Sequence, residues 1–155
     1  MSDGLKTFWG TISQGLDLGL ADLLALDWAE VEEDQDGCPL SVNWAHYRTQ
    51  ERLGVLQPLF MTLDGRLIGY NVFFVHCPGH HSLTKWAIGD LIYLDPEYRL
   101  GARGLRLIAE PEARFRAQGV RRILYTVKVR GSVGELLQRC GYAPYEASFA
   151  KLLGD

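Results

Sequence analysis

Hydrophobic positions repeat with two different periods along the chain. Before residue 55, apolar side chains recur every three or four positions, which is the spacing of one helix face. Later they alternate with polar residues, as in a strand with one buried face. The first part is predicted to hold a strand over 6–12, helices over 17–33 and 42–53, and a turn over 34–39. Ser41 is predicted to cap the second helix, which contributes Trp44 and Tyr47 to the core.

The later part of the chain has the pattern of a sheet. Strands are predicted over residues 56–62, 67–76, 83–94, 122–129 and 149–153. The turn Leu63-Asp64-Gly65-Arg66 joins the first two into a hairpin. The strand over 83–94 is apolar on both faces near its end, so we expect it inside the sheet rather than at an edge.

Two helices are expected among these strands, the first over residues 104–118. Its inward face is predicted to hold Leu105, Ile108, Ala109 and Phe115. Pro111 should kink this helix or split it at Glu110, because proline lacks the N–H that bonds back along a helix. The second helix runs from a Ser132 cap to Cys140. An antiparallel meander followed by a strand–helix–strand crossover predicts a mixed α/β sheet.

Length and composition fit one globular domain over residues 1–155. The chain has a mass of 17.4 kDa and 47% apolar residues, enough for a single core without disulfide or metal support. Its apolar runs are shorter than the roughly 18 residues of a membrane span, and no signal peptide opens it. The three cysteines, Cys38, Cys77 and Cys140, form no paired motif, which indicates reduced thiols and a cytoplasmic location.

The charges are divided unevenly between the two parts of the chain. Residues 1–64 carry 11 acidic and 3 basic side chains, whereas residues 65–155 carry 8 acidic and 13 basic ones. A basic half suits an anionic ligand and an acidic half suits a cationic one, although solvated faces would explain both equally well. The net charge of −3 argues against a general nucleic-acid-binding protein.

The turn before the first of these helices is the best candidate for ligand binding. Its sequence is Arg99-Leu100-Gly101-Ala102-Arg103-Gly104. The free N–H groups and the dipole of a helix N-terminus attract phosphate, and Arg99 and Arg103 add forked donors. The turn is neither a Walker A loop, which needs a following Lys-Ser/Thr, nor a GxGxxG fingerprint.

Three runs of sequence carry a resemblance to a known family. They are Leu91-Ile-Tyr-Leu-Asp-Pro-Glu-Tyr-Arg99 with the loop behind it, Gly119-Val-Arg-Arg-Ile-Leu-Tyr125, and Leu136-Leu-Gln-Arg-Cys-Gly-Tyr142. Over residues 55–153 the chain resembles the GNAT N-acetyltransferase superfamily, and in particular small GNAT-like proteins of bacteriophages and prophages. The resemblance implies a mixed, mostly antiparallel sheet with a splayed central strand pair and helices on both faces.

The resemblance also implies that acetyl-CoA is a co-substrate. Its pantetheine arm would pair with the backbone of Ile92, Tyr93 and Leu94. Its pyrophosphate would lie on Arg99, Leu100, Gly101, Ala102, Arg103 and Gly104. Ala102 stands where the family has a glycine, which would cost about 1 kcal/mol if that position needs a positive φ. Leu137 stands where many members have a tyrosine that protonates the departing thiolate, so no general acid is assigned.

Asp90 is the candidate general base. Strand alternation puts it on one face with Trp86, Ile88, Ile92 and Leu94. It is the only carboxylate in that apolar strand, and a buried carboxylate needs a partner or a raised pKa. In GNAT enzymes a carboxylate or histidine near this place deprotonates the incoming ammonium, directly or through water. The alternative is a structural role, in which Asp90 accepts hydrogen bonds from a core hydroxyl or the backbone.

His80 and His81 are further candidates, because they lie just before the strand that carries Asp90. A neutral imidazole there could relay a proton from the acceptor. Together with His76 and Cys77 they lack the usual spacing of zinc ligands, so no metal is expected. The alternative is an exposed polar loop.

Trp28 and Glu30 are candidates for acceptor binding. They lie in the first predicted helix, which borders the acceptor cleft in the GNAT fold. Glu30, Glu32, Glu33 and Asp34 would attract an amine. The alternative is that this acidic run forms a solvated helix face.

The sequence thus predicts an acyl-CoA-dependent N-acyltransferase that moves an acetyl group directly to a primary amine, with no covalent enzyme intermediate. The acceptor would be a small molecule or a protein, no membrane partner is expected, and the family suggests a homodimer. A catalytically silent GNAT-fold interaction protein is one alternative. A phage-type transferase acting on nucleic-acid bases is another, although the acidic first half would repel phosphates.

Overall fold

The computed structural model describes residues 4–32, 37–129 and 131–153. The strands of this part are β1 (Leu5–Trp9), β2 (Leu56–Leu63), β3 (Arg66–His76), β4 (Lys85–Leu94) and β5 (Val120–Tyr125). The α-helices are α1 (Ile12–Asp17), α2 (Leu20–Asp27), α3 (Trp44–Arg52), α4 (Arg103–Ala117) and α5 (Val133–Arg139). A π-helical turn, Trp28–Glu32, continues α2, and a 3₁₀ helix, Pro96–Tyr98, follows β4.

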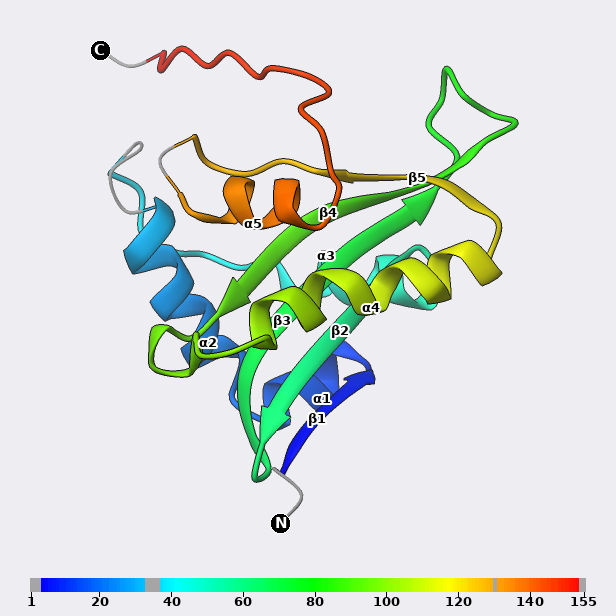
Figure 1. The fold of residues 1–155 in the computed structure, drawn as a ribbon. Helices are drawn as coiled ribbons and strands as arrows, with labels where there is room; N and C mark the ends of the chain where they lie inside the picture. Colours follow the sequence, from blue (N-terminus) through cyan, green and yellow to red (C-terminus); the bar gives the residue numbers. More distant parts are fainter. Residues whose placement is uncertain (1–3, 33–36, 130, 154–155) are drawn as a thin grey trace.

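The strands lie side by side in the order in which they occur along the chain (Figure 1). The first three pairings are antiparallel, and β4 pairs with β5 in parallel. The predicted hairpin is confirmed. Asp64 and Gly65 between β2 and β3 have φ values of 49° and 84°, as a type I′ turn requires. The predicted interior position of β4 is also confirmed, because β3 and β5 flank it.

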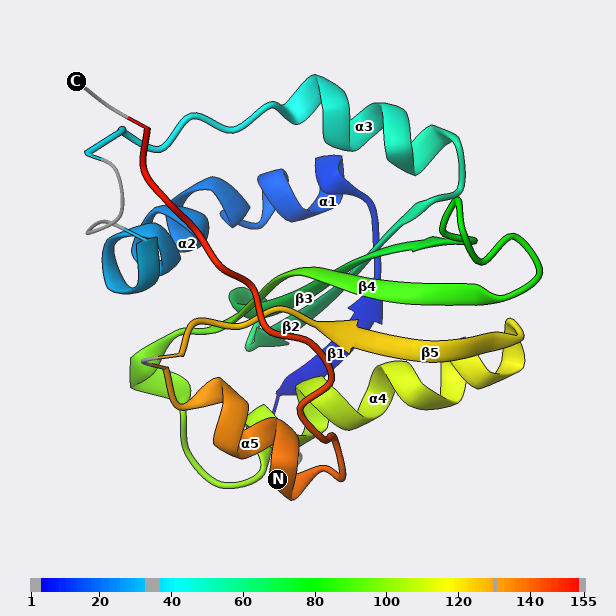
Figure 2. The ribbon, with the colours of Figure 1, turned by 90° about the horizontal axis from the view of Figure 1, so that it is seen from above.

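Helices cover both faces of the sheet (Figure 2). On one face lie α1, α2 and α3, and Leu23 of α2 belongs to the same buried cluster as Tyr70 of β3. On the other face lie α4 and α5, and Phe115 of α4 packs edge-on against Phe73 of β3. This two-sided mixed sheet is the fold class that the sequence predicts.

The interior strand β4 leaves its neighbour β5 halfway along its length. The two strands pair from Lys85 to Gly89 of β4, and the rest of β4, beginning at Asp90, has no partner in β5. In Figure 1 the backbone beyond β5 diverges from that of β4, and this separation of the two backbones is called the gap. A β-bulge lies at the same point, because Val72 of β3 faces Leu91 whereas Phe73 faces Gly89, and Asp90 is skipped.

The first helices differ from the prediction. The helix expected over 17–33 begins only at Leu20, because Gly19, with φ of 98°, separates α2 from the unpredicted α1. The preceding strand ends at Trp9 rather than at residue 12. The cap of α3 is Asn43, whose side chain accepts the N–H of His46, and not Ser41. Positions 33–36, which include part of the expected turn, lie outside the described residues.

Helix α4 runs without a break through Pro111, so the expected split at Glu110 is wrong. The inward face is also shifted from the predicted one. Leu107 and Pro111 are buried, whereas Ala109 is exposed. The apolar spacing alone did not predict this shift of the buried face, because the proline ring itself forms part of that face.

The last predicted strands need correction. β5 begins two residues before the predicted start and ends at Tyr125 instead of 129. Residues 149–153 form no strand, and Phe149 and Leu153 are 95% and 87% exposed. The alternation is present in the sequence, but the backbone of this segment pairs with no strand in the described chain. Among the described helices, none has the length and apolar character needed to cross a membrane.

Candidate active site

Helix α4 presents an open N-terminus at the end of the loop that follows β4. Its N-cap residue is Ala102, and no side chain caps the first turn there. Thr11 and Asn43, in contrast, cap α1 and α3 with their side chains. The N–H groups of a first helical turn have no acceptor within the helix and carry the positive end of its dipole. The loop that is predicted to bind pyrophosphate, from Leu100 to Gly104, therefore lies at an anion-attracting position.

The loop conformation puts no strain on Ala102. Ala102 has φ of −94°, which any residue adopts, and the positive φ of 62° falls at Gly101 instead. The condition for a penalty of about 1 kcal/mol, a positive φ at Ala102, is therefore not met. The glycine that stands one place early in the sequence makes the left-handed turn.

The free edge of β4 contains the residues predicted to meet the pantetheine arm. On its other edge, Ile92 pairs with Asn71 of β3 and Tyr93 pairs with Tyr70. The carbonyl of Leu94 accepts a 2.7 Å hydrogen bond from Nε of Arg99. The end of this edge is thus already bonded, and the part nearer the bulge faces the gap.

Asp90 lies within the bulge, where β4 and β5 separate. It is exposed, so the predicted burial of its carboxylate is wrong. Its Oδ2 accepts a 2.6 Å hydrogen bond from the hydroxyl of Tyr47 on α3. Burial of Tyr47, and then the Asp90 carboxylate, raise the pKa of Tyr47, so this hydroxyl keeps its proton and remains the donor. A hydroxyl donor to Asp90 was expected under the structural alternative, but sequence reasoning did not identify it as Tyr47, which it placed in the core.

The bulge also reverses the faces of the strand. Asp90 reaches toward α3, whereas Leu94 and Ile92 pack with Leu107 of α4 on the opposite face. The predicted common face of Asp90, Ile92 and Leu94 is therefore wrong. One extra residue in a strand moves every later side chain to the other side of the sheet.

Glu30 and Arg99, which were assigned to different ligands, bind each other. Nη1 and Nη2 of Arg99 lie 2.7 and 2.9 Å from the two carboxylate oxygens of Glu30. The Tyr93 hydroxyl also donates to Glu30, at 2.7 Å, and the guanidinium lies 5.3 Å above the Tyr93 ring. Arg99 therefore points to the π-helical turn and not to the N-terminus of α4. Its hydrogen bonds hold the pKa of Glu30 below the usual value.

A cavity of about 470 Å³ lies beside this ion pair. The π-helical turn, Tyr93 and the start of the loop after β4 line it, and they contribute Glu30, Asp95 and Glu97. Asp95 is paired with Arg66 at 3.7 Å. The acidic groups that would attract an amine are thus partly neutralised by arginines within this cluster.

Three tyrosines on this side of the sheet donate to carboxylates. The pairs are Tyr47 with Asp90, Tyr70 with Asp27, and Tyr93 with Glu30. The Tyr70 pair is buried, with a distance of 2.5 Å. No sequence signal could have found these pairs, because their members lie 43 or more positions apart.

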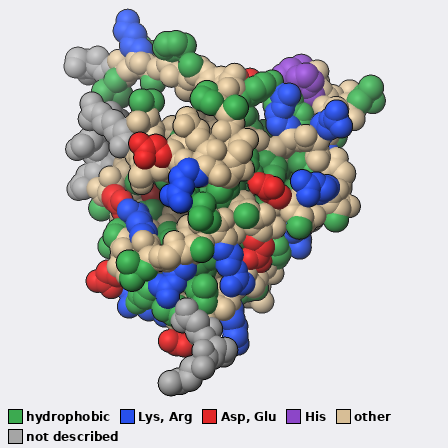
Figure 3. Space-filling model, viewed as in Figure 1, with side chains coloured by type: hydrophobic (Ala, Val, Ile, Leu, Met, Phe, Trp, Pro, Cys, Tyr) green, Lys and Arg blue, Asp and Glu red, His purple; other side chains and the backbone are tan. Residues whose placement is uncertain are grey.

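The two predicted histidines lie away from Asp90. The His81 ring stacks on Trp86 at 4.8 Å, and His80 lies 4.5 Å from His81. Trp86 precedes Asp90 by four residues, which is about 13 Å along a strand. In Figure 3 histidine side chains appear at the upper right, where the β3–β4 hairpin ends. Within the described ranges, no group of His, Cys, Asp and Glu side chains could hold a metal ion.

Trp28 is half-buried at the start of the π-helical turn, two residues before Glu30. The acidic residues Glu33 and Asp34 lie outside the described residues. A π-helical turn is rare and often marks a functional position. Trp28 and Glu30 are thus brought to the same turn, next to Tyr93 of β4.

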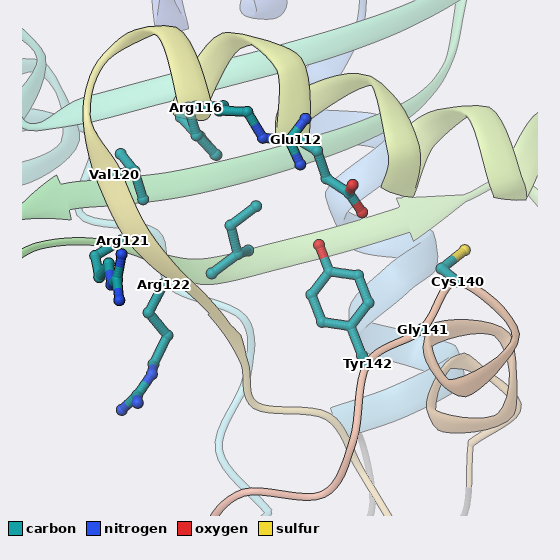
Figure 4. A pocket seen from close by; sticks show the side chains of 10 residues that line it. Glu112, Arg116, Val120, Arg121, Arg122, Cys140, Gly141 and Tyr142 are labelled. Atoms are coloured by element: carbon teal, nitrogen blue, oxygen red, sulfur yellow. The ribbon is translucent and has the colours of Figure 1, made fainter.

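A second cavity, of about 340 Å³, lies between the later part of α4, β5 and residues 140–142 (Figure 4). The Glu112 carboxylate and the Tyr142 hydroxyl point toward each other there, while Arg121 and Arg122 extend away. The Tyr142 hydroxyl is buried without a hydrogen-bond partner among the described residues. Burial raises the pKa of Cys140, so this thiol is not activated. None of the predicted site residues lines this cavity.

Comparison with known proteins identifies the fold. No family model and no curated protein matches the sequence. A soil-metagenome aminoglycoside acetyltransferase in complex with sisomicin has a TM-score of 0.75 at 12% identity, covering 97% of both chains. Glucosamine-6-phosphate N-acetyltransferase from Arabidopsis thaliana has a TM-score of 0.74 at 13% identity, covering 97% of this chain and 99% of that one. Aminoglycoside N-acetyltransferase AAC(6')-Iy in complex with CoA has a TM-score of 0.70 at 15% identity, covering 99% and 97%.

These structures are N-acetyltransferases, and the likeness extends over nearly the whole of each chain. The chain therefore has the GNAT fold, as its sequence resemblance implied.

Proposed function

We propose that the protein is an acetyl-CoA-dependent N-acetyltransferase that acts on a primary amine. One observation carries this proposal. Strand separation, a β-bulge and an exposed carboxylate coincide at Asp90, and the loop after the same strand leads to an uncapped helix N-terminus. An acyl transfer from CoA needs a binding edge for the pantetheine arm, an anion site for the pyrophosphate and a base near the thioester.

Asp90 is the proposed general base. It takes a proton from the ammonium group of the acceptor, directly or through water, and the free amine attacks the thioester carbonyl. The C–N bond forms, the C–S bond breaks, and the electron pair leaves on the CoA sulfur as a thiolate. A backbone N–H at the free edge of β4 would polarise the carbonyl. The Tyr47 hydrogen bond orients the Asp90 carboxylate for the first step.

The acceptor is proposed to be a cationic amine on a small molecule or a protein. The acidic first part of the chain builds the helices on the Asp90 side of the sheet, which favours a positively charged acceptor. Trp28 and Glu30 would border it. His80 and His81 are left out of the proposed site because of their distance from Asp90. We propose a single-domain cytoplasmic enzyme, and a homodimer remains the family's suggestion.

A non-catalytic GNAT-fold interaction protein is the second candidate. The observation that favours it is Leu137, which is buried and stands where many family members have a tyrosine. Arg99 also favours it, because its guanidinium is held by Glu30. Acetyl-CoA binding separates the two candidates only in part, because the interaction protein could bind CoA or not, whereas turnover separates them fully.

Calorimetric titration with acetyl-CoA tests the proposed pyrophosphate site. Ala102→Asp places a carboxylate at the N-terminus of α4, where the helix dipole favours it by about 0.5 kcal/mol. The same carboxylate would repel the pyrophosphate, so we expect a folded protein of at least wild-type thermal stability that has lost acetyl-CoA binding. Ala102→Ser is the matched control, because it adds a small polar group without a charge and should bind acetyl-CoA much better than Ala102→Asp. Unchanged binding by Ala102→Asp would contradict the assigned loop.

A screen of amine acceptors then separates the two candidates. Wild-type protein should release CoA with at least one amine, and Asp90→Asn should bind acetyl-CoA normally but turn over about 100-fold more slowly. Binding without turnover for every amine would favour the interaction protein.

A further inference from the structure

Tyr125 lies at the closed end of the gap between β4 and β5. It is the last residue of β5 and faces Gly89, the last β4 residue paired with that strand. Its ring lies against Gly89 so closely that a Cβ atom at Gly89 would be 2.7 Å from Cδ1 of Tyr125. Tyr125 and Asp90 therefore lie next to the same point of β4. The Asp90 carboxylate turns toward α3, and the Tyr125 ring packs with Phe73 on the α4 side.

The tyrosine hydroxyl is oriented by Asn71, which is fully buried on β3. Nδ2 of Asn71 donates to the carbonyl of Leu107 at 3.0 Å and to the Tyr125 hydroxyl at 2.8 Å. A carbonyl can only accept, so the amide group that faces Leu107 is the NH₂ and not the oxygen. Both amide protons are then used, and the Tyr125 oxygen must act as acceptor. Its own proton remains available, and no acceptor takes it within the described part of the chain.

Pro111 explains why the Leu107 carbonyl is free to accept a hydrogen bond from Asn71. In an α-helix the N–H of residue 111 would bond to the carbonyl of residue 107. Proline has no N–H, so this carbonyl lacks its helical donor, and Asn71 takes that place. Because of these contacts, the Tyr125 oxygen accepts from Asn71, and its own proton must point away from the Asn71 amide.

The cluster also contains an unused acceptor. Oδ1 of Asn71 is buried and has no hydrogen-bond partner among the described residues. A buried polar atom without a partner is costly and calls for an explanation. The Asn71–Tyr125 pair thus holds one acceptor and one donor that no described residue uses, and the donor belongs to the tyrosine at the point where β4 and β5 separate.

We propose that Tyr125 donates a hydrogen bond to the CoA sulfur as the thiolate departs, and that Asn71 is its positioning residue. This inference rests on the proposed acetyltransferase function. Tyr125 would take the role of stabilising the departing thiolate. At the position where many family members have a tyrosine for this role, this chain has Leu137, which has no hydroxyl. As the C–S bond breaks, its electron pair moves to sulfur, and the Tyr125 O–H stabilises the growing negative charge. The ammonium proton goes to Asp90, and the released thiolate takes its proton from water.

The surroundings of Tyr125 suit donation of a hydrogen bond rather than full proton transfer. Burial raises the pKa of Tyr125, so the hydroxyl stays protonated over the whole working range. A hydrogen bond of this kind acts only as charge develops on sulfur, so it lowers the barrier without strengthening acetyl-CoA binding.

Tyr125→Phe tests the proposal, because phenylalanine keeps the ring and removes only the hydroxyl. We expect kcat with acetyl-CoA to fall about 100-fold while KM for acetyl-CoA stays unchanged. Tyr142→Phe is the matched control. Its ring packs edge-on against Tyr125 at 5.4 Å, but its hydroxyl lies in the separate cavity of Figure 4, so kcat should not change.

A second acyl donor distinguishes a catalytic from a structural effect. Acetyl-seleno-CoA, the selenium analogue, has a better leaving group that needs less stabilisation. The loss caused by Tyr125→Phe should therefore shrink with this donor. An unchanged kcat, or an equal loss with both donors, would overturn the proposal for Tyr125. Wild-type protein that binds acetyl-CoA but transfers nothing would instead overturn the proposed function itself.

Discussion

At the level of single residues, the contact between Glu30 and Arg99 changes the roles that the sequence indicates for both side chains. Glu30 alone was a candidate for attracting the amine of the acceptor. Arg99 alone was a candidate for binding the pyrophosphate. In the structure the two side chains instead form a bidentate pair with each other. The pair instead ties the π-helical turn to the loop that precedes α4.

This ion pair gives a pH-dependent contribution to stability. The pKa of Glu30 is lowered from 4.5, so its contribution is present above 4.5 and is lost as the pH falls through the lowered value. Both side chains are 39% exposed, so solvent screening limits the contribution to about 1 kcal/mol or less. Wild type should therefore be slightly more stable than Glu30→Gln to urea at neutral pH. The difference should vanish in acid, and a difference that grows in acid would contradict the lowered pKa.

Asp90 shows what sequence can and cannot predict about a site residue. Its position as the lone acid of an apolar strand was enough to select it. Its exposure and its partner Tyr47 were not predictable, because a one-residue bulge leaves no periodic signal and the partner is 43 positions away. The contact between Tyr125 and Asn71 was not predictable either, because these residues are also far apart in the sequence.

At the level of elements, the helix α4 and strand β3 are coupled through Pro111. The proline leaves the Leu107 carbonyl without a helical donor, and Asn71 supplies one from the sheet. Sequence reasoning identified the proline as a disturbance of the helix. The structure shows that the missing hydrogen bond is replaced from the neighbouring strand, so that the helix continues to Ala117.

A double-mutant cycle measures this coupling. Asn71→Leu leaves the buried Leu107 carbonyl without a partner and should lower the free energy of unfolding by about 1–3 kcal/mol. In a Pro111→Ala background the new N–H of residue 111 bonds to the same carbonyl, so Asn71→Leu should cost less there. Urea unfolding of the four proteins gives the coupling energy. Strict additivity would show that the proline does not control this carbonyl.

Other elements were predictable where residues close together in the sequence determine the backbone conformation. The β2–β3 hairpin follows from Asp64-Gly65, which accepts the positive φ values of its turn. The start of α4 after a small-residue loop was also predictable. The division of the first helical region was not, because Gly19 interrupts an apolar spacing that continues on both sides of it.

At the level of the whole molecule, the GNAT fold was predictable from three short runs of sequence, although no family model matches the chain. The final strand was the main error. A strand needs a paired neighbour as well as an alternating pattern. The described sheet ends at β5, and the segment after Tyr142 lies beyond that edge without joining it (Figure 1).

The exposed C-terminal segment leads to a prediction about self-association. Phe149 and Leu153 are almost fully exposed, and apolar side chains in this setting promote contacts between molecules. The double variant Phe149→Ser/Leu153→Ser should leave the free energy of unfolding within about 0.5 kcal/mol of wild type, because no core packing is lost. In sedimentation velocity at rising concentration, wild type should form larger species than the variant. Ser148→Ala, an exposed neighbour, is the control and should behave as wild type. A large loss of stability in the double variant would show that these side chains pack within the chain, against the exposure seen here.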